Sequence, residues 1–425
     1  MNILIIGAGG VGRSAAMIIK QAGAEGSWAE KLVLADYNLQ RAEEAAALCG
    51  GTTRFIPEKV DARDSAGISG IIKKHTIHFV MNAVEPSYNE TIFDACLQNK
   101  VGYLDCAMTL SRPHPTDPYH KVNVKLGDYQ FAKHDDWVKA GCTAIAGSGV
   151  EPGMVDCFVR FAKERLFDTI DEVNIRDGDN YTGGGFGFSV WTTIEECLNP
   201  PIIWEKGKGW FTTERFSEPE IFNFPGGIGD VEVVNVEHEE VILVPRVIDC
   251  NRVTFKYGVP KAFRDLLLNL ESVGMADKEK TLELGGAAIT PRDFLVRVIP
   301  NPIESSSAME GKGCAGAWIR GVKNGKRRSV YLYQVSDNQD CVKKYTTNSV
   351  VAQTAVGPVI MMELIARGIW DLKGVYGPES FDPFPFIERL AKYGFPAGIR
   401  EMDSEYSKSL DENNLLELIS RGGKE

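Results

Sequence analysis

The chain has 425 residues, of which 44% are hydrophobic and 25% are charged, the composition of an ordinary globular protein of two or three domains. Its formal net charge of −11 argues against a nucleic-acid or anionic-membrane partner, because either would bind a basic surface. No apolar run approaches the roughly 20 residues of a membrane span, and no signal segment is recognised, so we expect a cytoplasmic protein. Nine scattered cysteines without a CxxC pair indicate reduced thiols and no metal site.

The chain opens with the pattern of a dinucleotide-binding turn. The apolar run 3–6 predicts a buried parallel strand, which leads into Gly7-x-Gly9-x-x-Gly12 and then a predicted helix over 14–22. The first glycine permits a sharp turn, the second lets a pyrophosphate approach the backbone, and the third lets helix and strand pack closely. The helix start also offers free N–H groups to phosphates. We therefore predict cofactor contacts at Gly7, Gly9, Gly10, Val11 and Gly12.

A second apolar strand, 31–35, ends in Asp36, close to the distance beyond Gly12 at which dinucleotide-binding proteins carry an acidic residue. A carboxylate there accepts hydrogen bonds from the ribose hydroxyls of adenosine and repels a 2′-phosphate. The sequence therefore predicts NAD in preference to NADP, with NADP as the alternative. A glycine turn without a ligand is the other interpretation, which the flanking strand and helix disfavour.

Strands and helices alternate up to about residue 150. Strands are predicted at 53–60, 77–84, 101–105 and 143–149, and helices at 39–48, 65–75, 89–98 and 129–140. This order predicts a Rossmann domain over 1–150, with a doubly wound parallel sheet of about six strands. Residues at the carboxyl ends of such strands lie beside the cofactor. Here these are Asp61, Ala62, Asn82, Ala83, Ser148 and Gly149, joined by Pro152 near the start of the next helix.

The pattern changes after residue 150. Short β-like runs are predicted at 172–176, 231–236, 241–244 and 252–257, with a hairpin of 318–322 and 328–333 across Asn324-Gly325 and helices at 261–273 and 291–298. We interpret 151–345 as an inserted α+β domain with a mixed, mostly antiparallel sheet, which binds substrate and forms the dimer interface. The segment 346–425, with an apolar helix over 349–367, returns to pack on the Rossmann domain. An open sheet edge in the second domain predicts a homodimer.

Five motifs together resemble the saccharopine dehydrogenase family: GAGGVG at 7–12, VDARD at 60–64, GYLDCA at 102–107, GSGVEPGM at 147–154 and GVYGPESFDPFPF at 374–386. VEHEE at 236–240 and the segment 314–341 are similar to the carboxynorspermidine and carboxyspermidine dehydrogenases of that family, and lysine 6-dehydrogenase is another similar branch. Asp36-Tyr37-Asn38 departs from the polyamine branch, which usually has Ser, Arg or Thr residues there. The stretch 181–230 also matches less well.

The resemblance implies an NAD(P)-dependent oxidoreductase acting on the C–N bond of an amino-acid-derived secondary amine or imine, of the saccharopine or carboxynorspermidine type. Its ligand would be a small amine or amino acid. Lysine 6-dehydrogenase activity is one alternative, and a non-catalytic NAD sensor is the second. A sensor needs only the cofactor site, whereas an enzyme also needs polar residues in the second domain.

Reduction of an imine needs a partner for the proton on nitrogen. Asp105 is the leading candidate because it follows a buried strand at the carboxyl edge of the sheet and matches the acid of the family's YLD motif; a turn cap is the alternative. Tyr103 shares its face of the strand, with plain core packing as the alternative. His238 and Glu240 share one face of a strand-like alternation and form a second candidate pair, unless that strand is an exposed edge.

Substrate carboxylates need cationic partners, and the planar fork of arginine binds them in bidentate fashion. Arg246 and Arg252 flank 247–251, and Arg176 follows another predicted strand. The sequence therefore predicts substrate binding at Arg176, Arg246 and Arg252. The acids of 236–240 and the arginines of 246–252 are close in sequence, which favours an enzyme over a sensor.

Overall fold

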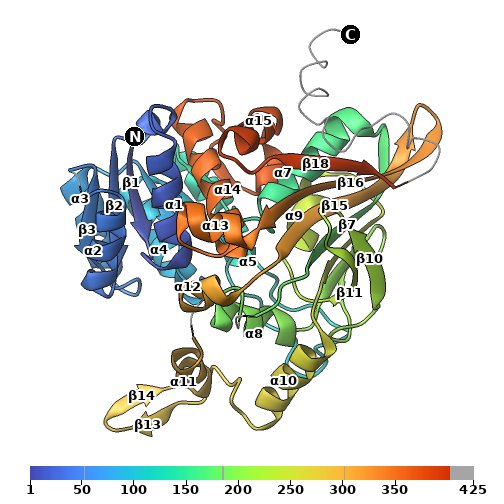
Figure 1. The fold of residues 1–425 in the computed structure, drawn as a ribbon, viewed down its shortest axis with the longest axis horizontal. Coiled ribbons are helices and arrows are strands. Elements are labelled where there is room, and N and C mark those ends of the chain that lie inside the picture. The colour runs from blue at the N-terminus through green and yellow to red at the C-terminus, as the bar shows by residue number, and fades with distance from the viewer. Residues whose placement is uncertain (52, 184–185, 301, 403–425) are drawn as a thin grey trace.

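The structure, a computed structural model, describes residues 1–51, 53–183, 186–300 and 302–402 (Figure 1). Within these residues the chain forms a seven-stranded sheet, a nine-stranded sheet and a separate two-stranded sheet. Residues 403–425, the end of the predicted C-terminal segment, lie outside the described residues. The predicted fold class, a Rossmann sheet plus an α+β region with a mixed sheet, is confirmed.

The first sheet is parallel throughout and has the order β17-β6-β5-β4-β1-β2-β3. Its strands are β1 (Asn2–Ile6), β2 (Lys31–Asp36), β3 (Phe55–Lys59), β4 (Phe79–Asn82), β5 (Gly102–Asp105), β6 (Thr143–Ile145) and β17 (Gly374–Tyr376). The accompanying helices are α1 (Gly10–Gln21), α2 (Leu39–Leu48), α3 (Ser65–His75), α4 (Asn89–Asn99), α5 (Asp128–Phe131) and α6 (His134–Ala140). The buried aliphatic run of β1 places it in the middle of the sheet, as parallel strands covered on both faces require.

Two features of this sheet differ from the sequence prediction. A seventh strand, β17, pairs with β6 although the sequence separates them widely. The single helix predicted over 129–140 is instead two helices, because the backbone leaves helical geometry at Lys133. The ammonium group of Lys133 donates to Asp94 Oδ1 at 2.5 Å and to the Tyr129 hydroxyl at 2.6 Å, which anchors the break against α4.

The second sheet is mixed and mostly antiparallel, with the main order β10-β11-β12-β7-β15-β16-β18; β8 pairs with β12, and β9 pairs with β8. Its strands are β7 (Thr169–Asp179), β8 (Ile202–Glu205), β9 (Gly209–Thr212), β10 (Glu220–Phe224), β11 (Gly229–Asn235), β12 (Arg252–Tyr257), β15 (Lys312–Lys323), β16 (Lys326–Asp337) and β18 (Ala397–Glu401). The predicted hairpin is confirmed: Asn324 and Gly325 both have positive φ, at 52° and 73°, as a type I′ turn requires.

The predicted strand at 241–244 is wrong. These residues lie in helix α9 (Glu240–Val247), and the candidate pair His238 and Glu240 therefore does not stand on one face of a strand. The run 241–244 is fully buried, and a short apolar run that is buried on all sides has no periodicity that separates strand from helix. Packing of α9 against β12 decides in favour of the helix.

Helices α7 (Met154–Phe161), α8 (Val190–Leu198), α13 (Asn338–Tyr345), α14 (Ser349–Ala366) and α15 (Phe384–Lys392) connect or cover the two sheets. Helix α14 packs along α1 of the Rossmann region, as Figure 1 shows. Among the described helices, α14 alone is long and apolar enough to cross a membrane, but 83% of it is buried inside the protein, as in a core helix. The chain then adds β17 to the first sheet and β18 to the second.

One segment extends away from the main body at the lower edge of Figure 1. It contains α10 (Lys261–Ser272), β13 (Leu282–Leu284), β14 (Ala287–Ile289) and α11 (Pro291–Val298), followed by the short helix α12 (Pro302–Ser305). We call residues 261–299 the arm. Glu195 of α8 anchors it through ion pairs with Lys278 and Arg292.

Candidate active site

A cavity of about 540 Å³ opens between the carboxyl edge of the first sheet and the second sheet. One wall comes from the glycine turn and the end of β4, and contributes Ala8, Gly9, Gly10, Val11, Ala83, Val84, Glu85 and Pro86. The opposite wall comes from α8, β7, β12 and the segment before α9, and includes Asp177, Thr192, Thr193, Glu196, His238, Phe255 and Tyr257. Cys106, Ala107, Glu151 and Pro152 lie between them. In Rossmann proteins this sheet edge is where dinucleotides bind.

The glycine turn has the geometry that a pyrophosphate needs. Gly7 has φ +102°, and a Cβ there would lie 2.6 Å from the carbonyl oxygen of Ala83. No atom lies within 4 Å of the Cβ position at Gly9, so this side of the backbone is open to a ligand. Helix α1 begins at Gly10 without a side-chain cap, which leaves its first N–H groups for phosphate oxygens.

Asp36 lies directly behind the glycine turn. Its buried carboxylate accepts hydrogen bonds from the backbone N–H of Ala8 at 3.0 Å and of Asn38 at 2.9 Å. Arg41 of α2 lines the cavity nearby, with its guanidinium 5.7 Å from the ring of Tyr37. This end of the cavity is lined by Arg13, Arg41 and Glu44, with the fixed carboxylate of Asp36 behind the glycine turn.

The remaining predicted cofactor residues divide into two groups. Ala83 and Pro152 line the cavity, as predicted. Asp61 binds Arg63 in an exposed ion pair, Asn82 is held by Asn89 and Tyr103, and Ser148 bonds the backbone carbonyl of Asp105. These side chains, with Ala62 and Gly149, lie outside the cavity lining.

Asp105 lies behind the cavity wall, while the next two residues, Cys106 and Ala107, line it. The Asp105 carboxylate is buried and accepts four hydrogen bonds: from Gly147 N at 2.7 Å, Gln130 Nε2 at 2.6 Å, the Tyr103 hydroxyl at 2.9 Å and Asn89 Nδ2 at 3.4 Å. Burial raises the pKa of Asp105 to about 7 in spite of these donors. Asp105 thus ties β5, α4, α5 and the segment after β6 together, and Tyr103 is one of its donors.

His238 occupies the opposite wall, in the segment between β11 and α9. Its imidazole is stacked on Phe255 at 3.7 Å, and Nδ1 lies 2.7 Å from Glu240 Oε2. Burial alone would lower the pKa of His238, but Glu240 and Glu239 raise it to about 10. Glu240 is fully buried, and its Oε1 has no hydrogen-bond partner among the described residues. The structure therefore brings the predicted pair together, with a charged imidazole.

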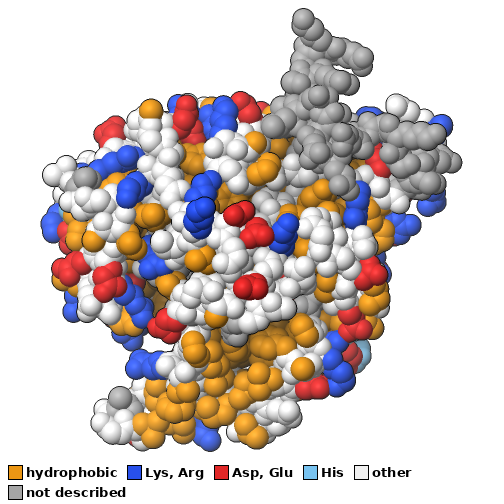
Figure 2. Space-filling view, in the orientation of Figure 1, with side chains coloured by type: hydrophobic (Ala, Val, Ile, Leu, Met, Phe, Trp, Pro, Cys, Tyr) orange, Lys and Arg blue, Asp and Glu red, His pale blue; other side chains and the backbone are white. Residues whose placement is uncertain are grey.

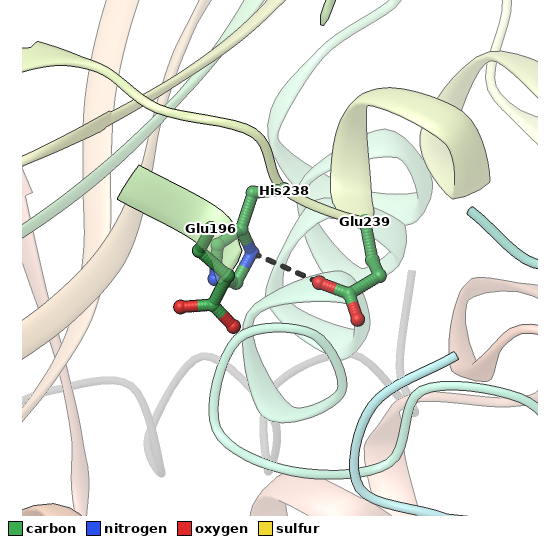
Figure 3. A group of neighbouring side chains, drawn as sticks. All are labelled: Glu196, His238 and Glu239. Carbon is green, nitrogen blue, oxygen red and sulfur yellow. Dashed lines mark ion pairs between the residues drawn. The ribbon is translucent and has the colours of Figure 1, made fainter. Parts of the chain in front are cut away.

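Two further acids surround this imidazole. Figure 3 shows Glu196 of α8 and Glu239 on either side of His238, with Glu239 Oε2 at 3.4 Å from Nδ1. Ligand atoms of the three side chains lie within 4.8 Å of one another, close enough to surround one positively charged group. Burial raises the pKa of Glu196 to about 8.

Glu151 and Asp177 form a second acidic pair in the cavity wall. Glu151 precedes α7 and Asp177 lies on β7, and their side chains share a hydrogen bond. Burial raises the pKa of Glu151 well above its usual range and that of Asp177 to about 7. Neither residue was singled out from the sequence, because the segments that carry them are separated along the chain and meet only in the folded protein.

The three predicted substrate arginines lie outside the cavity lining. Arg176 Nε binds Glu220 at 2.5 Å, on the face of β7 opposite to Asp177, because side chains alternate along a strand. Arg252 Nη1 binds Glu205 at 2.6 Å at the start of β12, whereas the end of that strand lines the cavity. The Arg246 guanidinium lies 3.9 Å from the ring of Phe131. Each arginine is satisfied within the protein.

Comparisons with known proteins agree with this architecture. A family model for the saccharopine dehydrogenase NADP-binding domain matches residues 3–145, and a model for the saccharopine dehydrogenase C-terminal domain matches residues 149–395. The chain belongs to the saccharopine dehydrogenase family. It is an NAD(P)-dependent oxidoreductase, and the resemblance seen in the sequence is confirmed.

Two curated relatives of this saccharopine dehydrogenase family member span nearly its whole length. A carboxynorspermidine synthase of Vibrio alginolyticus is 27% identical over 95% of this chain and 98% of its own. A carboxyaminopropylagmatine dehydrogenase of Synechocystis is 27% identical over 93% of this chain and 96% of its own. The apo saccharopine dehydrogenase (L-Glu forming) of Saccharomyces cerevisiae shares the fold, with a TM-score of 0.64 at 14% identity over 95% of this chain and 100% of its own.

Proposed function

We propose that this enzyme forms or cleaves the C–N bond of a secondary amine whose amine half is cationic, as in carboxynorspermidine or carboxyaminopropylagmatine. The observation that carries the proposal is the charge of the cavity. Among the lining residues, the acids Glu151, Asp177 and Glu196 lie away from the glycine turn, whereas Arg13, Arg41 and Glu44 belong to α1 and α2 beside that turn. The substrate end is therefore acidic.

An acidic wall discriminates among the substrates that the family offers. Saccharopine carries several carboxylates, which would meet buried acids without an arginine from the second domain to bind them. A di- or polyamine carries ammonium groups, and a buried carboxylate binds an ammonium strongly because the low local dielectric weakens the competition from water. Saccharopine and lysine are thus the less favoured substrates.

The chain's own residues have distinct roles in this proposal. The glycine turn and α1 hold the dinucleotide, which supplies or accepts the hydride when it is bound. Glu196 binds an ammonium group of the substrate. The His238–Glu240 pair keeps a positive charge between the acids and fixes their orientation. Asp105 and Tyr103 hold the strand ends that form the floor of the cavity.

The test is oxidation of carboxynorspermidine, carboxyaminopropylagmatine, saccharopine and lysine, each with NAD and with NADP. We expect the two cationic compounds to be oxidised with kcat/KM at least about tenfold above the other two. Glu196→Gln should raise KM for them by about tenfold, because Glu196, which burial keeps largely protonated, can give up its proton and pair with the ammonium, whereas Gln cannot. The matched control is Glu44→Gln, which removes an exposed acid at the dinucleotide end and should leave KM for the amine unchanged. Faster oxidation of saccharopine would overturn the proposal.

A preference for NAD over NADP belongs to the same proposal. Asp36 supports it, because both carboxylate oxygens are fixed by backbone N–H groups and the side chain cannot swing away from a 2′-phosphate. Arg41 opposes it, since a guanidinium in the cavity wall would attract that phosphate. Steady-state kinetics with both cofactors decide between the two.

We also propose a cytoplasmic homodimer, with the chain divided into domains at residues 150 and 345. The exposed apolar side chains of the arm are the observation that supports a dimer. Of the larger apolar side chains that it exposes, Val273 and Val298 are the most open, at 72% and 63%, and the others are Leu266, Leu268, Leu284 and Phe294. Figure 2 shows hydrophobic side chains gathered over the lower part of the molecule, where the arm lies. The arm carries six basic and six acidic residues, so two copies would not repel each other.

Light scattering at micromolar concentration tests the dimer. Val298→Asp should produce monomers if the arm forms the interface. Ile221→Asp is the matched control, because it changes an equally exposed residue on β10, an edge of the second sheet. If only Ile221→Asp yields monomers, the open sheet edge is the interface, and a monomeric wild type contradicts both versions.

A further inference from the structure

The Glu151–Asp177 pair differs from the other acids of the cavity because its two carboxyl groups are hydrogen-bonded to each other. An ionised carboxylate can only accept hydrogen bonds, so two ionised groups cannot form this contact. One of the two must carry a proton. Glu151 Oε2 is buried and receives no hydrogen bond from a donor among the described residues, and both side chains of the pair line the cavity.

The groups that face the pair keep this proton in place. Asp179 follows on β7, Glu196 comes from α8, and Glu240 comes from α9; each disfavours a second negative charge on the pair. His238 is a cation that faces Asp177, and it is already bonded to Glu240. Tyr257 also lies within electrostatic reach of Asp177 and lines the cavity.

The pair also stands where the reaction must occur. Glu151 is followed by Pro152, and both line the cavity beside Cys106 and Ala107, which end the central strand β5. In Rossmann proteins the reactive end of the cofactor lies at this edge. Asp105 reaches the same edge, but its carboxylate is behind the wall and is occupied by four donors.

We propose that the Glu151–Asp177 carboxyl pair gives its shared proton to the imine nitrogen when the C–N double bond is reduced. This inference rests on the proposed function. The hydride of the reduced cofactor bonds to the imine carbon, the π electron pair of the C=N bond moves to nitrogen, and nitrogen takes the proton from the pair. The products are the secondary amine, the oxidised cofactor and a doubly ionised pair, which regains one proton from solvent. In oxidation the pair accepts that proton.

Two isosteric variants test the step. Glu151→Gln and Asp177→Asn should each lower kcat for the amine by about 10²–10⁴-fold, the usual contribution of a general acid, while the affinity for reduced cofactor changes by less than about threefold. Wild-type turnover in the reductive direction should fall at alkaline pH as the pair loses its proton, and this limb should be absent from both variants. Asp171→Asn is the matched control, since it removes an acid at the other end of β7, outside the cavity lining, and should leave turnover and its pH profile unchanged.

A second measurement needs neither turnover nor substrate. At neutral pH, the infrared spectrum of the wild type should contain the carbonyl band of a protonated carboxyl group. Glu151→Gln should lack this band, so the band should appear in the difference between the wild-type and variant spectra. If Glu151→Gln fails to fold, the same difference is taken with Asp177→Asn, because Asp105 and Glu196 also keep protons near neutral pH and contribute similar bands to the wild-type spectrum. Absence of a titrating band overturns the inference, as does a folded variant that keeps more than a third of wild-type turnover or an unchanged pH profile. If the band is present but no cationic amine is oxidised, the proposed function fails and the proton-sharing pair stands.

Discussion

The two walls of the cavity recognise their ligands by opposite means. The wall from the first sheet offers mainly backbone groups and open space at Ala8 to Val11 and Ala83, with Glu85 at the end of β4. The wall from the second sheet carries buried ionisable side chains. The glycine turn of the first wall forms within one short stretch of chain, whereas the second wall needs four segments to meet. Cofactor binding is therefore local in the sequence, and substrate binding depends on the whole fold.

The largest expected effect concerns the wall from the first sheet. In Gly12→Ala the new Cβ would lie 1.9 Å from the carbonyl oxygen of Gly7 and 2.9 Å from Ile5 Cγ2. Overpacking costs about 1–3 kcal/mol, so we expect cofactor affinity to fall by about tenfold to hundredfold. Fluorescence titration with NADH or NADPH measures it. Gly70→Ala on α3 is the control, because nothing lies within 4 Å of its Cβ and it should bind cofactor normally.

Asp105→Asn tests whether a buried acid outside both walls is structural. The amide offers one acceptor oxygen where the carboxylate offers two, so at least one of the four donors loses its partner and we expect a loss of about 1–3 kcal/mol in the free energy of unfolding. Because Asp105 lies behind the wall, kcat should fall by less than about tenfold. A fall of 10²–10⁴-fold with unchanged stability would restore the role as acid that the YLD motif predicts. Urea unfolding and steady-state kinetics give the two numbers.

Asp36→Ser tests how the wall from the first sheet selects between NADH and NADPH. Removing the fixed charge beside the ribose should shift the ratio of kcat/KM for NADPH over NADH upward by about tenfold, the equivalent of ~1.4 kcal/mol. Kinetics with both reduced cofactors measure the ratio. If the wild type already prefers NADPH, Arg41 outweighs Asp36 and the predicted cofactor preference is wrong.

The smallest expected effect is the pH dependence of stability, which comes from the ionisable side chains of the wall from the second sheet. Folding raises the pKa of Asp177 to about 7, of Glu196 to about 8 and of His238 to about 10. Between pH 6 and 9, the unfolded chain binds fewer protons at these three groups than the folded protein does, because their pKa values are lower in the unfolded chain. The free energy of unfolding therefore falls as pH rises. The melting temperature should therefore drop by a few degrees across this range. A melting temperature that rises with pH would contradict the assigned shifts.

The sequence predicted the first wall because each of its features is carried by neighbouring residues. The buried run of β1 and the positive φ of Gly7 are confirmed, as is the turn at Asn324-Gly325 in the second sheet, which is equally local in the sequence. The second wall was predicted only in part. The sequence pattern at 236–244 predicted strand structure, but residues 240–247 form a buried helix. Arg176 lies on the opposite face of β7 from the cavity, because neighbouring side chains alternate along a strand. Glu196 carried one signal, its place beside Glu195 in a short helix that is half apolar, and Glu151 carried only its place in the GSGVEPGM motif, whereas Asp177 carried none.

The positions of β17 and β18 have a consequence for synthesis of the protein on the ribosome. Each of the two large sheets takes a strand from residues 374–401, and each of these strands lies at an edge of its sheet. While the preceding part of the chain emerges, β6 and β16 each present a row of unpaired backbone groups to any other nascent or misfolded chain. A ribosome that stalls before residue 374 would therefore release a product with two unprotected edges, and chaperones that bind such edges should associate with this chain late in translation.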